Sequence, residues 1–325
     1  ENPLSDDLYY RLAKVFLDFK KFNEAKKFIS QAIEIDPSKI EYRTFYAEIL
    51  YELDGTDTAI GYLRKLEEEF PQNPYLHGEI AIYYFKSGQI KDFEQTKVDL
   101  EKMAYPRTNL SRYLIRVSNL SNNTNDVIKY TEELLINEPG DLEARMNLAK
   151  IFYDQEKYTD ALKHFGEVKK LLDSYPKLLY YIARIYLKTG EVEKAYEYAQ
   201  KEVSLNPSLE DGYVLLGEIY ILQSKWVEAD REYKRAQSVN KYSFDAYMGL
   251  AYLHFKKGQL SESLSLYKQA QTLNPNNPEV YRQLGDVYRL LGLSVDAIES
   301  YRVFLSHVPD SSQRPQIESY INALK

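Results

Sequence analysis

Three basic residues in the middle of the chain recur at a constant interval and could bind an anion. Arg116, Lys150 and Arg184 follow one another at steps of 34 residues. Arg112 and Lys177 lie near them in the sequence. If elements of one kind present these residues to a common surface, their charges would attract an acidic peptide segment or a terminal carboxylate.

Residues that could perform catalysis do not group together. The four histidines, His77, His164, His254 and His307, lie far apart, and none has a second histidine four residues away to form a metal-binding pair. Cysteine is absent, which excludes disulfides, thiolate nucleophiles and metals bound through sulfur. The sequence contains no P-loop, no Gly-rich nucleotide motif, no GxSxG motif and no kinase motif. We therefore expect no enzyme, no cofactor and no metal site.

A 34-residue period defines the elements that must position the basic residues. The stretch 278–311 contains two amphipathic patterns with helical spacing, separated at Gly292 and closed at Pro309, so it predicts a hairpin of two helices. Positions that precede Gly285 and Ala297 by multiples of 34 are mostly small residues, and no insertion or deletion breaks the period. Small side chains at a fixed interval let helix backbones approach closely, which predicts tandem hairpins that pack on their neighbours.

The stretch 278–311 resembles a tetratricopeptide repeat. The residues that match the W-L-G-Y…A-F…P spacing of this family are Tyr281, Leu284, Gly285, Tyr288, Ala297, Tyr301 and Pro309. Phe304 departs from the pattern, because the family prefers a small residue there. The resemblance implies an all-α fold, a right-handed αα-superhelix in which the first helix of each hairpin lines a concave groove for peptides. We expect nine repeats over 6–311, starting near 6, 40, 74, 108, 142, 176, 210, 244 and 278, and a C-terminal capping helix over 312–325.

The pattern is weakest over 74–141. Phe93 and Val127 replace the small residue of the second helix, and the stretch 118–126 is polar with few strong helix formers. We expect looser packing here and a longer turn inside the hairpin. Tolerated degeneration, a hinge and a special binding geometry are all open as explanations.

The candidate binding residues lie on the first helices, on the face opposite the packed positions. We expect the groove to be lined by Tyr51, Phe85, Arg112, Arg116, Asn147, Lys150, Tyr153, Lys177, Tyr180, Arg184, Ile221, Tyr252 and Phe255. Because Glu48 and Glu218 flank the basic residues, the groove should be basic at its middle and acidic beyond. The alternative is that these side chains only pack between repeats, with their charged ends reaching solvent.

Some tetratricopeptide repeat domains hold the C-terminal carboxylate of chaperones with a clamp of Lys, Asn, Asn, Lys and Arg. Asn147 and Lys177 match this set, whereas Arg112 replaces a Lys, Arg116 an Asn and Tyr181 the Arg. These departures argue against chaperone binding, and general carboxylate capture stays a hypothesis.

Composition narrows the partner and the compartment. With 49 acidic and 42 basic residues the net charge is −7, so nucleic acid is a poor partner. No apolar run is long enough to span a membrane, and no signal peptide is recognisable. The chain begins at Glu1 without a methionine, so we expect that a segment was removed before it. The absence of cysteine is compatible with the cytoplasm and with a periplasmic or envelope compartment, and the localisation is open.

Three functions fit these observations. The first is a scaffold that binds a protein or peptide in the concave groove, to which some of the 31 tyrosines would contribute contact area. The second is a structural subunit of a larger complex, for example in the cell envelope, that uses its convex face and ends. The third is a regulatory arm of a larger protein whose other domain lies outside this chain.

Overall fold

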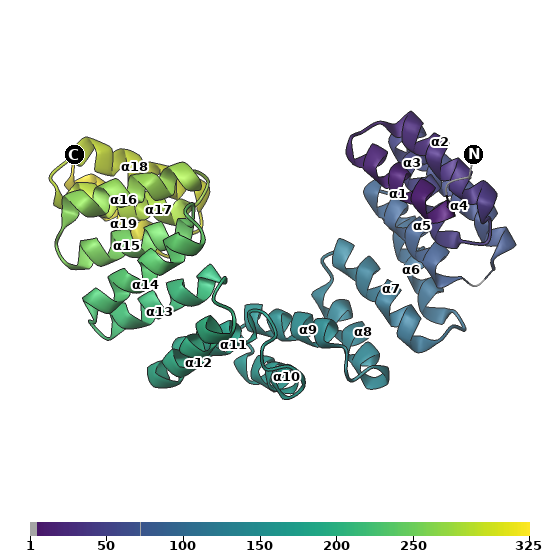
Figure 1. Cartoon of the computed structure of the whole chain (residues 1–325). Helices are drawn as coiled ribbons and strands as arrows, with labels where there is room; N and C mark the ends of the chain where they lie inside the picture. The colour runs from purple at the N-terminus through teal and green to yellow at the C-terminus, as the bar shows by residue number, and fades with distance from the viewer. Residues whose placement is uncertain (1–4, 72) are drawn as a thin grey trace. The chain divides into compact units, whose positions relative to one another are not determined.

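The computed structural model describes residues 5–71 and 73–325, which form nineteen α-helices and no strand (Figure 1). The chain divides into two compact units after Ile151, within α9 (Leu142–Asp154). Unit 1 contains α1 (Asp6–Asp18), α2 (Phe22–Ile35), α3 (Ile40–Asp54), α4 (Thr56–Glu69), α5 (Pro74–Lys86), α6 (Ile90–Lys102), α7 (Arg107–Leu120) and α8 (Thr124–Asn137). Unit 2 contains α10 (Tyr158–Leu171), α11 (Leu178–Lys188), α12 (Val192–Leu205), α13 (Glu210–Leu222), α14 (Trp226–Val239), α15 (Phe244–Lys256), α16 (Leu260–Leu273), α17 (Pro278–Leu290), α18 (Ser294–His307) and α19 (Arg314–Ala323).

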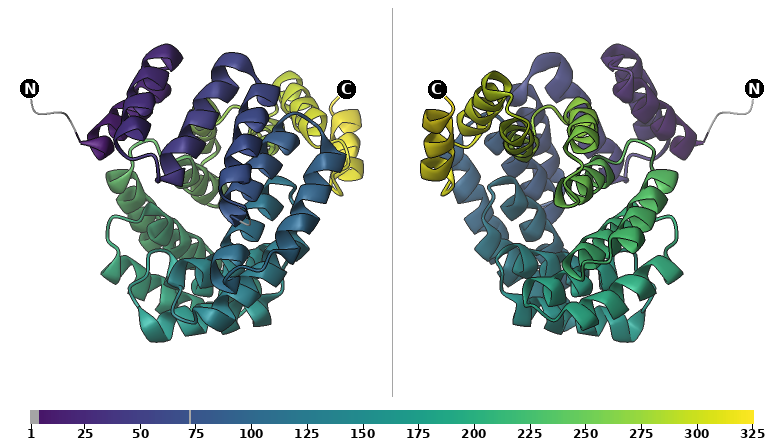
Figure 2. Two further views of the ribbon diagram at one scale, coloured as in Figure 1. Left: turned by 90° about the vertical axis from the view of Figure 1, so that its right-hand side faces the viewer. Right: turned by 90° about the vertical axis from the view of Figure 1, so that its left-hand side faces the viewer.

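Within each unit, consecutive helices pair into hairpins, and each hairpin packs on the next (Figure 2). We call the odd-numbered helices α1 to α17 first helices and the even-numbered ones second helices. The all-α fold expected from the sequence is confirmed, with α19 as the C-terminal cap whose Ile317 and Ile321 are buried. The division of 6–311 into nine repeats stays a prediction.

The small residues of the 34-residue period lie where helices touch. Ala13, Ala25 and Ala229 are completely buried. A Cβ atom added to Gly217 would lie only 2.6 Å from the ring of Tyr233. The period therefore reflects close contact between the two helices of a hairpin and between adjacent hairpins.

The turn inside each hairpin, from α1–α2 to α17–α18, contains one residue with left-handed backbone. These residues are Lys20, Gly55, Gly88, Asn122, Glu156, Gly190, Ser224, Gly258 and Gly292, with φ between 51° and 87°. Glycine adopts this conformation without steric cost, whereas Lys20, Asn122, Glu156 and Ser224 carry a side chain there. A left-handed residue ends the first helix and lets the chain reverse.

The prediction of a longer turn over 118–126 is wrong. Helix α7 continues to Leu120 and α8 begins at Thr124, so the turn is short. Asn122 supplies the left-handed residue (φ 51°), and the side-chain oxygen of Asn123 accepts a hydrogen bond of 3.2 Å from the backbone N–H of Asp126. The polar composition thus encodes a compact turn and an N-cap, because asparagine suits both roles. The hinge stays a prediction.

Candidate binding surface on the first helices

A hollow in unit 1 is lined only by side chains of the first helices α1, α3, α5 and α7. Its volume is about 210 Å³, and its lining residues are Tyr10, Lys14, Glu41, Thr44, Phe45, Glu48, Tyr75, Glu79 and Arg116. Aromatic rings form part of the wall, and Tyr10 and Phe45 meet edge to face with their centroids 5.3 Å apart. We call this site the unit 1 hollow.

Charged groups of both signs surround the unit 1 hollow. The guanidinium of Arg116 forms an ion pair with the buried carboxylate of Glu79. Burial raises the pKa of Glu79, and the positive charge of Arg116 offsets part of this effect. The hydroxyl of Tyr10 donates a hydrogen bond of 2.6 Å to Glu41, and the ammonium of Lys14 lies 4.1 Å from the centroid of the Tyr10 ring.

A smaller hollow in unit 2 lies on the first helices α11, α13 and α15. Its volume is about 110 Å³, and its lining residues are Tyr180, Arg184, Asp211, Val214, Leu215, Glu218 and Asp245. Arg184 pairs with Glu218 at 2.6 Å, and Lys177 beside the hollow pairs with Asp211 at 2.5 Å. Partial desolvation by the surrounding walls of the hollow raises the pKa of both Glu218 and Asp245. We call this site the unit 2 hollow.

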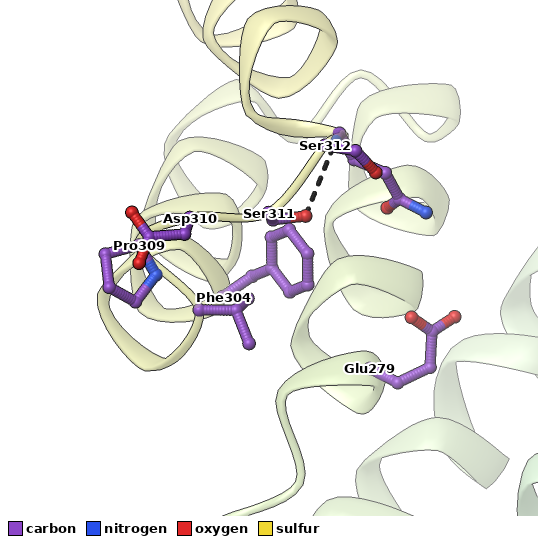
Figure 3. A pocket seen from close by; sticks show the side chains of 8 residues that line it. Glu279, Phe304, Pro309, Asp310, Ser311 and Ser312 are labelled. Carbon is purple, nitrogen blue, oxygen red and sulfur yellow. Dashed lines mark hydrogen bonds between the residues drawn. The ribbon is translucent and has the colours of Figure 1, made fainter. Parts of the chain in front are cut away.

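A third depression lies at the C-terminal end of unit 2 (Figure 3). It has a volume of about 530 Å³ and is bordered by Glu279, Phe304 and the segment 308–313. The loop that leads into α19 forms most of its wall, so it differs from the two hollows on the first helices.

The structure brings three of the predicted groove residues into the hollows. Arg116 lines the unit 1 hollow, and Tyr180 and Arg184 line the unit 2 hollow. Lys177 stands at the border of the latter through its pair with Asp211. Arg116, Lys177 and Arg184 are each paired with a carboxylate of the chain, and the basic middle of the groove stays a prediction.

The other predicted residues lie elsewhere. In unit 1, Arg112 pairs with Asp141 at 2.6 Å, the ring of Tyr51 packs on Tyr83, and Phe85 packs on Phe93. In unit 2, Tyr153 contacts Tyr181, and Tyr252 stacks on Phe255. Asn147 is exposed and Lys150 is partly buried, both on α9.

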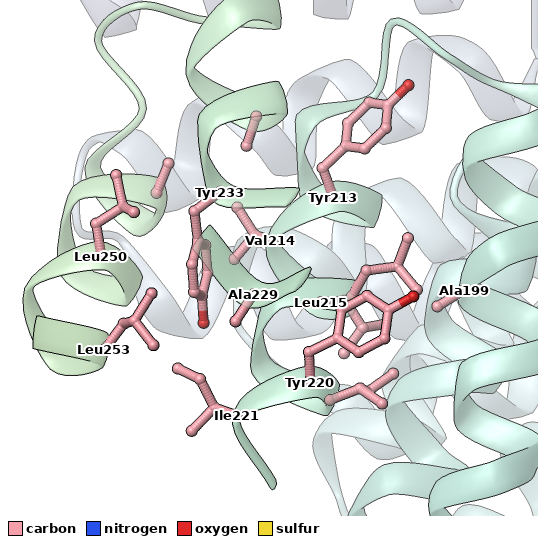
Figure 4. Packing of buried hydrophobic residues seen from close by; sticks show 14 of the residues in the cluster. Ala199, Tyr213, Val214, Leu215, Tyr220, Ile221, Ala229, Tyr233, Leu250 and Leu253 are labelled. Atoms are coloured by element: carbon pink, nitrogen blue, oxygen red, sulfur yellow. The ribbon is translucent and has the colours of Figure 1, made fainter. Parts of the chain in front are cut away.

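Ile221 lies outside the hollows. Its side chain belongs to the hydrophobic core of unit 2, is only 8 % exposed, and is not among the residues that line the unit 2 hollow (Figure 4). The reason is that α13 contacts α11, α12, α14 and α15, which leaves few of its side chains accessible.

Most of the carboxylates in the hollows were not predicted from the sequence. Three of them, Glu41, Asp211 and Asp245, occupy the same position of the 34-residue period as Tyr75 and Lys177. All five lie in or beside a hollow. The 34-residue period that located the basic residues would also have located this position, which lies at or next to the N-terminal end of the first helices.

Sequence profiles described as "Tetratricopeptide repeat" match residues 6–39, 128–176 and 176–209, and one described as "TPR repeat" matches 253–292. The chain is a tetratricopeptide repeat protein. Its fold class, the αα-superhelix of this family, is the one expected from the sequence.

Known tetratricopeptide repeat proteins resemble the chain in sequence and fold. Hsp70-Hsp90 organizing protein 3 of Arabidopsis thaliana is 24 % identical over 226 residues, which is 66 % of this chain and 39 % of that protein. The chain thus spans about two fifths of the length of this relative. A thermophilic TPR protein of Thermus thermophilus superimposes with a TM-score of 0.51 at 24 % identity, over 56 % of this chain and 99 % of that one. A chain of the APC/C hetero-tetramer Cut9-Hcn1 gives 0.60 at 13 % identity, over 98 % and 76 %.

Membrane spans and metal sites are not found in the described part of the chain. None of the helices within 5–71 and 73–325 combines the length and the apolar character that a membrane span requires. In the same residues, no three His, Asp or Glu side chains converge in a way that could hold a metal ion.

Proposed function

We propose that this tetratricopeptide repeat protein is a non-enzymatic scaffold that holds a segment of a partner protein along its first helices. The observation that carries the proposal is that one hollow in each unit is lined only by first helices. Each hollow combines aromatic or apolar walls with charged groups, which is the mixture that protein recognition uses. The Arabidopsis relative, named as an organizer of Hsp70 and Hsp90, is consistent with a scaffold role.

The size of the hollows supports a peptide over a small molecule. Sites for small ligands usually measure roughly 300–1,000 Å³. The hollows measure about 210 and 110 Å³. Each is therefore suited to one side chain of a longer segment that runs across several first helices.

The sequence prediction of an acidic segment or C-terminal carboxylate as the bound group stays a prediction. Arg112, Arg116, Lys177 and Arg184 are held by carboxylates of the chain. An acidic partner would have to exchange with these carboxylates, which reduces the net gain from each new ion pair.

The proposal can be tested by selecting binders from a library of short random peptides and mapping them with a photo-crosslinking amino acid. Placed at Lys14 or Asp245, the crosslinker faces a hollow on the first helices. Placed at Glu24 or Val227, it lies on an exposed part of a second helix and serves as the matched control. We expect selected peptides to crosslink from the first pair of positions only. Failure to select any peptide, or crosslinks mainly from the control positions, would refute the proposal.

A structural subunit is the second candidate, and a specific surface favours it. The tips of two hairpins of unit 2 expose apolar side chains at matching positions of the period: Leu222 and Val227 on one, Leu290 and Val295 on the other. Val227 and Val295 are 80 % and 78 % exposed. If these tips pack in an assembly, the mass measured by light scattering should rise with concentration, and Val227→Ser with Val295→Ser should abolish the rise. A constant monomer mass would exclude self-assembly through the tips.

A further inference from the structure

The unit 1 hollow has more negative than positive charge available to a partner. Three carboxylates, Glu41, Glu48 and Glu79, face two cations, Lys14 and Arg116. Arg116 neutralises Glu79, whereas the Glu41 carboxylate accepts a hydrogen bond from the neutral hydroxyl of Tyr10 and forms no ion pair with the described residues. Glu48 is exposed and forms no ion pair with the residues the structure describes.

The walls of the hollow suit a cation. The rings of Tyr10, Phe45 and Tyr75 take part in the lining, and a ring face attracts an ammonium or guanidinium group placed over it. Lys14 already uses one of these faces, since its ammonium lies 4.1 Å from the centroid of the Tyr10 ring. An intramolecular cation at this position demonstrates the chemistry that an incoming side chain would repeat.

An anion, by contrast, is disfavoured in the same place. The guanidinium of Arg116 is one of two cations in the hollow, and it is paired with Glu79. Only about a tenth of the Glu79 side chain is exposed, so a carboxylate that displaced Glu79 from Arg116 would leave a buried charge without its partner. The unpaired Glu48 would also repel the incoming group.

From these contacts we infer that the unit 1 hollow accepts a lysine or arginine side chain of the partner segment, with Glu48 and Glu41 as its anionic contacts. This inference rests on the proposed function, because it specifies the chemistry of a segment bound along the first helices. It departs from the acidic segment that the sequence alone suggests.

The unit 2 hollow has the same charge balance, on separate residues. Arg184 faces three carboxylates there. Arg184 pairs with Glu218 and Lys177 pairs with Asp211, so Asp245 is the third carboxylate and has no cationic partner among these. Asp245 is exposed and forms no hydrogen bond or ion pair in the described part of the chain. The same class of side chain therefore fits both units.

The test uses the full chain and peptides selected on it from the random library. Each selected peptide is resynthesised with its lysines and arginines replaced by norleucine or by glutamate. Binding is measured by fluorescence anisotropy at low and at high salt. We expect the norleucine form to bind at least about tenfold more weakly, the glutamate form to lose binding, and the affinity of the original peptide to fall with salt.

Matched protein variants then locate the contact. Glu48→Gln removes the unpaired charge of the hollow, and Glu52→Gln removes an exposed charge one turn later on the same helix α3. We expect Glu48→Gln to weaken binding of the basic peptide about three- to fivefold, the upper part of the range for one exposed ion pair, and Glu52→Gln to have less effect. Circular dichroism checks that both variants keep their helices.

The outcomes separate this inference from the function on which it rests. If no peptide can be selected, the scaffold proposal fails. If peptides bind on the first helices but tolerate loss of their basic residues, prefer acidic ones, or respond equally to Glu48→Gln and Glu52→Gln, the proposed function survives and the basic side chain is refuted.

Discussion

Glu202 provides the sharpest test of how neighbouring helices support the candidate surface. Its carboxylate lies on α12, is completely buried, and accepts hydrogen bonds from the backbone N–H of Tyr180 at 3.0 Å and of Lys177 at 3.3 Å. The side-chain amide of Asn206 donates a third bond of 2.7 Å. The side chain of Lys177, the N-cap residue of α11, makes no capping hydrogen bond. Glu202 therefore caps α11 from the next helix.

Glu202→Ala should destabilise unit 2 by about 2–4 kcal/mol, because it removes the cap and leaves two backbone N–H groups without an acceptor. Glu202→Gln should cost about 1 kcal/mol, since one acceptor oxygen remains but the charge is lost. Urea unfolding gives the free energy, and hydrogen exchange at the amide of Tyr180 reports the cap directly. Because Tyr180 and Arg184 lie on α11, faster exchange in this helix would also indicate a less ordered unit 2 hollow.

The control is Glu197→Ala, an exposed position on the same helix. It makes the same change in charge and removes no cap, so we expect little effect on stability. If Glu202→Ala shifts the free energy of unfolding by less than about 0.5 kcal/mol, or if exchange in α11 matches that of the control, the capping argument is refuted.

Two further predictions concern packing and pH. Gly217→Ala should lower the free energy of unfolding by about 1–3 kcal/mol, measured by thermal or urea unfolding, because the new Cβ would lie 2.6 Å from the Tyr233 ring. The control Gly166→Ala should be neutral or stabilising, because its Cβ would have no atom within 4 Å. The hydrogen bond from Lys39 lowers the pKa of Asp6, so the stabilisation by this carboxylate is complete above about pH 4 and is lost as the pH falls through its lower, folded-state pKa. Asp6→Asn should remove this part of the acid dependence of the urea midpoint, and an unchanged acid dependence would contradict it.

The fold was predictable from the sequence because close helix contacts demand small residues. Small residues such as Ala13, Ala25 and Ala229 are completely buried at these contacts. Their recurrence every 34 residues therefore identifies the helix pairs. The turn near Asn122 is shorter than its composition predicts, because asparagine disfavours a helix interior but also suits a left-handed turn residue and an N-cap.

The partners of the charged groups could not be read from the period. Arg184 pairs with Glu218, which is 34 residues later, whereas Arg116 pairs with Glu79, which is 37 residues earlier. The direction of each pair depends on which rotamer reaches a neighbouring helix, and the sequence does not encode this locally. Periodicity therefore located the basic residues but left open whether their charge is available to a partner.

The left-handed turn residues offer a way to change the stability of the protein without altering the hollows on its first helices. Lys20, Asn122, Glu156 and Ser224 each hold a side chain in a conformation that glycine adopts at lower cost. Replacing them by glycine, one at a time, should raise the melting temperature in small separate increments. Since each hairpin contacts mainly its neighbours, such variants would also measure how far the added stability spreads from one turn to the adjacent hairpins.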